Sequence, residues 1–190
     1  MSIFGSDKLK GKRIAIVATD GFEQSELTEP KKYLENEGAE VDVISLKSGS
    51  IKGWDKTDWG DKVDVDKLIG DVQVADYDAL VLPGGQINPD KLRVEEKVVN
   101  FVGEFMRSGK VVAAICHGPW TLIETGLVHG KRMTSYPSIK TDLKNAGAQW
   151  EDSEVVVDKG LITSRNPDDI PAFNKKIVEE ILEGQHAARS

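Results

Sequence analysis

Three short apolar runs constrain the fold of this chain more than any other feature. They occupy residues 13–19, 79–82 and 111–115, and turn-forming residues follow each of them: Asp20-Gly21, Pro83-Gly84-Gly85 and Cys116-His117-Gly118. Such runs lack the polar alternation of half-exposed strands, so both faces of the sheet they form must be covered. The sequence therefore predicts an α/β fold with a mostly parallel sheet.

Helical patterns separate the apolar runs. Val98, Phe101, Val102 and Phe105 recur at i, i+3, i+4 and i+7, which predicts an amphipathic helix that ends at Gly109. Residues 25–36 predict a second helix, kinked or restarted near Pro30, and residues 170–181 predict the last one. Strands that alternate with helices indicate a sheet covered on both faces.

The remaining segments have weaker patterns. Residues 47–66 predict a hairpin or long loop in which Trp54 and Trp59 need cover. Strands are expected at 40–46, 132–134, 155–157 and 161–163, and a helix near 139–146. A chain of 190 residues without an evident linker suits a single domain over 1–190, with its core at about 12–183.

Composition excludes several classes of function. The formal net charge is −7, which disfavours electrostatically driven binding to nucleic acid or to an anionic membrane. One cysteine permits no internal disulfide, and three histidines make a structural zinc site improbable. No apolar stretch approaches membrane-spanning length and the first 12 residues lack a signal-like apolar region, so we expect a cytoplasmic protein.

The strongest candidate for chemistry is Cys116. Ala114-Ile115-Cys116-His117-Gly118 has the form of a strand-to-helix elbow, in which small neighbours permit a sharp turn that exposes a nucleophile. The following helix N-terminus is expected to lower the pKa of the thiol and to supply oxyanion donors. A buried core thiol is the alternative, and Gly118 with the adjacent His117 favours the nucleophile.

Other residues near the three strand ends complete a candidate site. His117 is a candidate base through its imidazole, or a donor through its backbone N–H, and Gly84 and Gly85 are candidate oxyanion donors. Glu23 is either a favourable charge at a helix N-terminus or a carboxyl that touches the thiol. His129 and His186 are interpreted as turn and tail residues without function.

Three enzyme or binding classes are disfavoured by missing motifs. A class I glutamine amidotransferase needs a downstream histidine followed two residues later by glutamate, and an α/β-hydrolase needs a later acid and then a histidine. Neither His129 nor His186 satisfies these patterns. A dinucleotide-binding fold would need a G-x-G-x-x-G motif after the first strand, and none is present.

The motifs together resemble those of the PfpI family, a group of cysteine hydrolase-like proteins within the glutamine amidotransferase-like superfamily. The resemblance runs from about residue 12 to 183. Its matching pieces are Asp20-Gly21-Phe22-Glu23 with Glu26-Leu27, Pro83-Gly84-Gly85, the segment from Ala114 to Pro119, Thr134-Ser135-Tyr136-Pro137, and Ser164-Arg165-x-Pro-x-Asp.

The resemblance implies a flavodoxin-like three-layer sandwich that forms dimers or hexamers. It implies Cys116 as nucleophile, Glu23 as a protonated carboxyl bonded to the thiolate, and His117 as the partner of a dyad. Asp90 is the candidate acid that a neighbouring subunit would direct at His117, and it is one methylene shorter than the expected glutamate. Tyr136 would line the pocket, whereas Arg165 and Asp169 would be structural.

Three functions suit such a site. We expect a stress-protective glyoxalase or deglycase that acts on methylglyoxal or its early glycation adducts, because sulfur can add to an aldehyde while a carboxylic acid relays protons. This chemistry needs no metal, glutathione or other cofactor. The alternatives are an intracellular cysteine peptidase, which the shorter Asp90 disfavours, and a non-enzymatic oxidation sensor or chaperone that uses Cys116.

Overall fold

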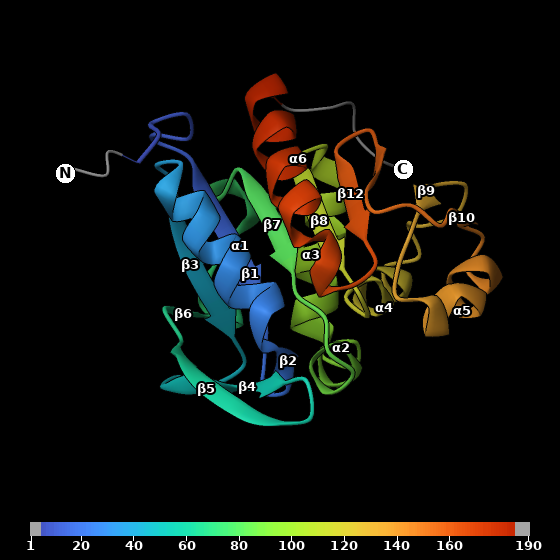
Figure 1. The fold of residues 1–190 in the computed structure, drawn as a ribbon, viewed down its shortest axis with the longest axis horizontal. Helices are drawn as coiled ribbons and strands as arrows, with labels where there is room; N and C mark the ends of the chain where they lie inside the picture. The colour runs from blue at the N-terminus through green and yellow to red at the C-terminus, as the bar shows by residue number, and fades with distance from the viewer. Residues whose placement is uncertain (1–4, 185–190) are drawn as a thin grey trace.

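The centre of the molecule is a seven-stranded sheet, seen in a computed structural model that describes residues 5–184 (Figure 1). The strand order is β11-β12-β8-β7-β1-β3-β6, and only β11 runs antiparallel to its neighbour. The strands are β1 (Arg13–Val17), β3 (Glu40–Ser45), β6 (Lys67–Leu68), β7 (Ala79–Leu82), β8 (Val111–Ile115), β11 (Val156–Asp158) and β12 (Leu161–Ser164). Every residue of β7 and β8 is buried, as their apolar sequences require.

Helices cover both faces of this sheet. On one face lie α1 (Gln24–Asn36) and α6 (Ile170–Glu183), side by side at the front of Figure 1. On the other lie α3 (Glu96–Ser108), α4 (Pro119–Glu124) and α5 (Lys140–Asn145). The predicted three-layer sandwich with a mostly parallel sheet is therefore confirmed.

Two small sheets flank the large one. β9 (Arg132–Met133) pairs with β10 (Gln149–Trp150), and β2 (Phe22–Glu23) pairs with the hairpin of β4 (Ser50–Asp55) and β5 (Asp58–Asp64). This hairpin, expected as one of two alternatives, lies with β2 near α2 (Ile87–Leu92) in Figure 1. The shorter 3₁₀ helices are η1 (Ile69–Asp71), η2 (Val74–Asp76), η3 (Pro137–Ile139) and η4 (Pro167–Asp169).

Of the two expectations near Pro30, a kink or a restart of the helix, the restart is wrong. Helix α1 is continuous through this residue, and the Pro30 ring is buried. A proline removes only one hydrogen bond of the helix, to the carbonyl four residues earlier, and burial of the inner face of α1 with Leu27 and Leu34 stabilises the remainder. None of the helices within residues 5–184 has the length and apolar character needed to cross a bilayer.

Candidate active site

Cys116 occupies a strained elbow directly after β8. Its φ is +63°, in the left-handed region that non-glycine residues rarely adopt. Cys116 N–H donates to Ser164 O at 3.0 Å, and Tyr136 N–H donates to Cys116 O at 2.9 Å, so neighbouring segments hold both peptide groups. Gly118 permits the turn, because a Cβ there would lie 2.6 Å from Leu82 O. The elbow predicted from the sequence is therefore present, with Cys116 buried.

His117 contacts the thiol through its side chain. Its Nδ1 lies 3.1 Å from Cys116 Sγ, and its Nε2 lies 3.1 Å from Ser138 Oγ. Burial lowers the pKa of His117 below its usual value near 6.5, so the imidazole is neutral at pH 7. When Nε2–H donates to Ser138, the lone pair on Nδ1 faces the thiol and can accept its proton.

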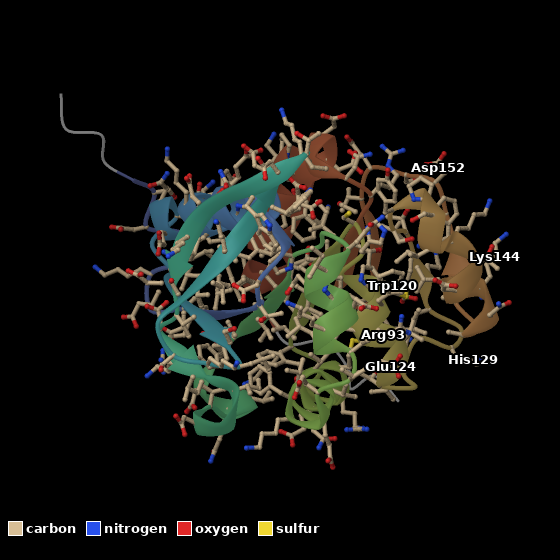
Figure 2. All side chains as sticks on the ribbon, turned by 90° about the horizontal axis from the view of Figure 1, so that it is seen from below. Arg93, Trp120, Glu124, His129, Lys144 and Asp152 are labelled. Atoms are coloured by element: carbon tan, nitrogen blue, oxygen red, sulfur yellow. The ribbon has the colours of Figure 1, made fainter. Side chains whose placement is uncertain are left out.

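Two aromatic rings fix the orientation of His117. Tyr136 stacks on the imidazole, with ring centroids 4.8 Å apart and 25° between the planes. Trp120 meets it edge-on at 5.1 Å. Figure 2 shows Trp120 next to Arg93 and Glu124, where Arg93 lies over the indole ring at 5.3 Å and binds the Glu124 carboxylate. The rings of Tyr136 and Trp120 therefore hold the imidazole, and Trp120 packs in turn against Arg93.

Glu26, rather than Glu23, faces the thiol. The Glu26 side chain is fully buried on the inner side of α1, its Oε1 accepts the Gly84 N–H at 3.1 Å, and the carboxyl interacts with Cys116. Burial, together with the negative charge of Glu23, raises the pKa of Glu26 to about 8. Glu26 is therefore protonated at neutral pH and can donate a proton. Its Oε2 is buried without a hydrogen bond of good geometry among residues 5–184.

The assignment of Glu23 as the carboxyl that touches the thiol is therefore wrong. Glu23 ends β2 just before the first helical residue, and its half-buried carboxylate accepts the backbone N–H of Lys56. Helical spacing could have identified Glu26, because it lies four residues before the buried Pro30 and next to the buried Leu27.

The expected lowering of the thiol pKa is also wrong. Burial raises the pKa of the Cys116 thiol above its ordinary value, and negative charge on Glu26 raises it further. The backbone N–H groups of Gly85 and His117 face the sulfur and lower its pKa, but by less than burial raises it. The resting group is a thiol that needs a base, and His117 is placed to be that base.

The sequence predicts that the Pro83-Gly84-Gly85 turn supplies two oxyanion donors, Gly84 and Gly85, but one of them has another role. The Gly84 N–H is engaged by Glu26, so it holds the carboxyl and is not free as an oxyanion donor. The His117 N–H remains as a candidate donor, and so does the Gly85 N–H, which interacts with Glu26 as well as with Cys116. A Cβ on Gly84 would lie 2.6 Å from both Cys116 Cβ and Glu26 Oε1, so this close approach requires glycine.

Asn88 secures this turn, a role that no sequence motif indicates. Its side chain is fully buried, donates to Pro83 O and Gly84 O, and accepts the Thr19 N–H at 2.8 Å. Asn88 thereby ties the turn after β7 to the end of β1. A lone asparagine in the first turn of a short helix carries no sequence signal for this role, which depends on the packing of two strand ends.

These residues surround a pocket of about 350 Å³. Its lining includes Cys116, His117 and Glu26 together with Glu23, Trp54 and Tyr136. This volume suits a small ligand, because pockets for drug-sized molecules span roughly 300–1,000 Å³. Among residues 5–184, no three His, Cys, Asp or Glu side chains cluster closely enough to hold a metal ion.

The other candidate residues are not among those that line this pocket. Asp90 is exposed on α2, and Arg165 binds Asp169 through its backbone N–H and its guanidinium. His129 is exposed in a turn at the surface labelled in Figure 2. His186 lies outside the described residues.

Comparisons with known proteins show which proteins this chain is similar to. General stress protein 18 of Bacillus subtilis is 48% identical over 87% of this chain and 95% of its own length. Protein/nucleic acid deglycase 2 of Escherichia coli is 46% identical with the same coverage. The crystal structure of Drosophila melanogaster DJ-1beta, 31% identical, matches with a TM-score of 0.82 over 90% of each chain. The model of the DJ-1/PfpI family matches residues 12–180, and the chain belongs to that family.

Proposed function

We propose that the protein is a stress-protective cysteine enzyme that converts methylglyoxal, free or as an early glycation adduct, to lactate. The observation that carries this proposal is the contact of one thiol with the His117 imidazole and the buried Glu26 carboxyl, all three of which line a small pocket. A base for the thiol and an acid for a carbonyl oxygen are the two groups that thiol addition to an aldehyde needs. The names of two relatives, a general stress protein and a protein/nucleic acid deglycase, support the stress-protective and deglycase parts of this proposal.

The first step forms a carbon–sulfur bond. His117 Nδ1 takes the thiol proton as Sγ adds to the aldehyde carbon, and Glu26 gives its proton to the aldehyde oxygen. The product is a neutral hemithioacetal, beside an imidazolium and a carboxylate. The N–H groups of Gly85 and His117 stabilise negative charge that develops near the sulfur.

The next steps isomerise and release the bound fragment. The Glu26 carboxylate removes the proton on the former aldehyde carbon and returns one to the adjacent carbon through an enediol, which gives a lactoyl thioester. Water then cleaves the C–S bond, the imidazolium returns its proton to sulfur, and the acid released reprotonates Glu26. The net reaction adds one water to methylglyoxal and yields lactate and a proton, so no redox partner is needed.

Glycation adducts enter through one additional bond cleavage. In the carbinol formed from methylglyoxal and an amine or thiol, the C–N or C–S bond breaks, the leaving group takes a proton, and the aldehyde is regenerated in the pocket. Cys116 then captures this aldehyde as above. Because the thiol supplies the nucleophile and Glu26 the proton, we propose that neither glutathione nor a metal takes part.

Lactate formation by wild type and Cys116→Ala tests this proposal. Both proteins are incubated with methylglyoxal in the absence of glutathione and presence of a chelator, and peptide substrates are run in parallel. We expect lactate from wild type and none above background from the folded variant. Equal lactate from both would contradict the proposal, as would peptide hydrolysis by a wild type that forms no lactate.

Self-association completes the proposal. Asp90 is exposed on α2, so its carboxylate is accessible to a neighbouring copy, and Trp59 is 45% exposed. We propose that the protein works in the cytoplasm as a dimer or hexamer in which Asp90 acts on a neighbouring site. Light scattering at micromolar concentration should give at least a dimer, and Asp90→Asn should lower turnover without changing that mass. A monomer with full activity would contradict this part alone.

A further inference from the structure

Glu23 and Trp54 form a corner of the pocket to which the proposed chemistry assigns no role. The two residues are register partners in the parallel pair of β2 and β4, so they lie side by side. Both line the pocket that contains Cys116. A carboxylate and an indole ring therefore share one wall of the cavity in which the thiol reacts.

The Glu23 carboxylate carries a negative charge into this wall. Its charge raises the pKa of Glu26, and the Lys56 backbone N–H stabilises its ionised form. Burial and the nearby Asp55 raise the pKa of Glu23, and the Lys56 ammonium lowers it. A partly desolvated carboxylate of this kind interacts with a cation more strongly than an exposed one does.

Trp54 is held rigidly beside this charge. Its indole N–H donates to Lys56 O at 3.1 Å, and its ring meets Trp59 edge-on at 5.4 Å. The same hairpin already places a cation over an indole, because Lys52 Nζ lies 5.8 Å from the Trp59 ring centroid. Tryptophan attracts cations over its face more strongly than the other aromatic residues do.

The combination of carboxylate and aromatic wall fits a guanidinium group. Guanidinium is planar, stays charged, bonds to carboxylates in a bidentate manner and stacks on aromatic rings. In an arginine adduct of methylglyoxal, the guanidinium nitrogen is bonded directly to the carbinol carbon. The cation would then lie beside Glu23 and Trp54, and the reacting carbon beside Cys116, within a single small pocket.

Resting on the proposed function, we infer that Glu23 and Trp54 form a cation subsite that selects methylglyoxal adducts carried by arginine over neutral adducts. Glu23 is thus a specificity residue, and Glu26 is the residue that moves protons. Charge on the leaving group, more than its size, decides which adduct is processed fastest.

The first arm of the test measures binding and is independent of turnover. Calorimetry compares N-acetyl-arginine amide with N-acetyl-citrulline amide, its uncharged isostere, on wild type and Glu23→Gln. The glutamine retains an oxygen for the Lys56 N–H but lacks the charge. We expect wild type to prefer arginine by at least about tenfold, as a charge-assisted hydrogen bond provides, and Glu23→Gln to lose that preference.

The second arm measures kcat/KM for methylglyoxal adducts of N-acetyl-arginine amide and N-acetyl-cysteine amide. Leaving-group reactivity cancels when their ratio is compared between proteins. The ratio should fall about tenfold in Glu23→Gln, fall also in Trp54→Leu, and stay unchanged in Asp55→Asn, which removes an exposed carboxylate of the same hairpin.

The two arms separate the inference from the proposed function. An arginine preference that persists in Glu23→Gln overturns the subsite, even when wild type forms lactate. Conversely, a wild type that forms no lactate but loses its arginine preference in Glu23→Gln retains the subsite and fails the proposed reaction. A change in Asp55→Asn equal to that in Glu23→Gln would assign the effect to general charge and also overturn the subsite.

Discussion

The Nδ1 atom of His117 lies 3.1 Å from the Sγ atom of Cys116, although the two residues are adjacent in the chain. Adjacent side chains diverge on most backbones. Here the positive φ of Cys116 turns the backbone so that both side chains reach the same pocket. The strained elbow thus has a chemical consequence, because it supplies a buried thiol with its base.

This contact predicts the pH dependence of methylglyoxal turnover. Neutral His117 is the active form, so kcat/KM should rise as pH passes the His117 pKa, which burial holds below about 6.5. Protonated Glu26 is also required, so kcat/KM should fall as pH passes about 8. The residual activity of Glu26→Gln should lack the decline near pH 8. A wild-type rate that continues to rise from pH 7 to 9 would instead indicate simple ionisation of the thiol.

Burial of Glu26 predicts a stability cost that depends on pH. The folded-state pKa is raised from 4.5 to about 8, so the group contributes its full stability below pH 4.5 and that contribution is lost as pH rises through about 8. At pH 7 the cost is on the order of 3 kcal/mol, from about 1.4 kcal/mol per pKa unit.

Glu26→Gln removes this cost while it retains the amide oxygen for the Gly84 N–H. Denaturant unfolding should therefore show the variant to be more stable than wild type at pH 7 and equal to it at pH 4. Equal stability at both values, with a folded and inactive variant, would show that Glu26 is not protonated more tightly in the folded state.

A pair of glycine substitutions separates backbone strain from crowding at the site. Gly85 and Gly126 both have positive φ, +79° and +72°, so alanine should cost about 1 kcal/mol of strain at either position. Only at Gly85 would the new Cβ collide, 2.5 Å from Gly21 O, whereas Gly126 has open space around it.

Gly85→Ala should therefore abolish most turnover, because the collision displaces the N–H group that faces Cys116 Sγ. Gly126→Ala should lose a similar amount of folding stability to backbone strain and keep its kcat. Steady-state kinetics and unfolding of both variants check this. Equal kcat in the two variants would remove the Gly85 N–H from the site.

The sequence alone predicted the framework of the molecule because local patterns carry it. Wholly apolar strands such as Val111–Ile115 imply coverage on both faces, and the elbow at Cys116 follows from small residues at a strand end. The pKa of the thiol could not be predicted in the same way. It depends on how completely the fold removes Cys116 from water, which the adjacent residues do not specify.

The exchange of Glu23 and Glu26 has a similar cause. Both acids lie at the start of α1, and a motif alone does not give the direction of a side chain at a helix boundary. Glu23 precedes the helix, and the direction of its side chain is set by the pairing of β2 with β4. Glu26 lies within the helix, and helical periodicity places its side chain in the core. Applying that periodicity to polar as well as apolar residues would have selected Glu26.

Ser138 is predicted to act as a positioning residue for His117. Its hydroxyl lies 3.1 Å from Nε2, and when it accepts the Nε2–H it leaves the Nδ1 lone pair of His117 directed at the thiol. Ser138→Ala should lower kcat about 2–10-fold, the effect of one hydrogen bond, shift the acidic limb of the pH profile, and leave KM unchanged. Ser138→Thr should restore both values. An altered KM with an unmoved pH profile would assign Ser138 to substrate binding instead.

The most direct test of the central claim, that Glu26 is the acid which serves Cys116, compares methylglyoxal turnover by Glu26→Gln and Glu23→Gln under identical conditions without glutathione. Both substitutions remove one carboxylic acid from the same pocket. General acid–base catalysis contributes about 10²–10⁴-fold, so kcat/KM should fall at least about 100-fold in Glu26→Gln and at most about tenfold in Glu23→Gln. A Glu26→Gln variant that matches wild type, or one that is more active than Glu23→Gln, would contradict the account.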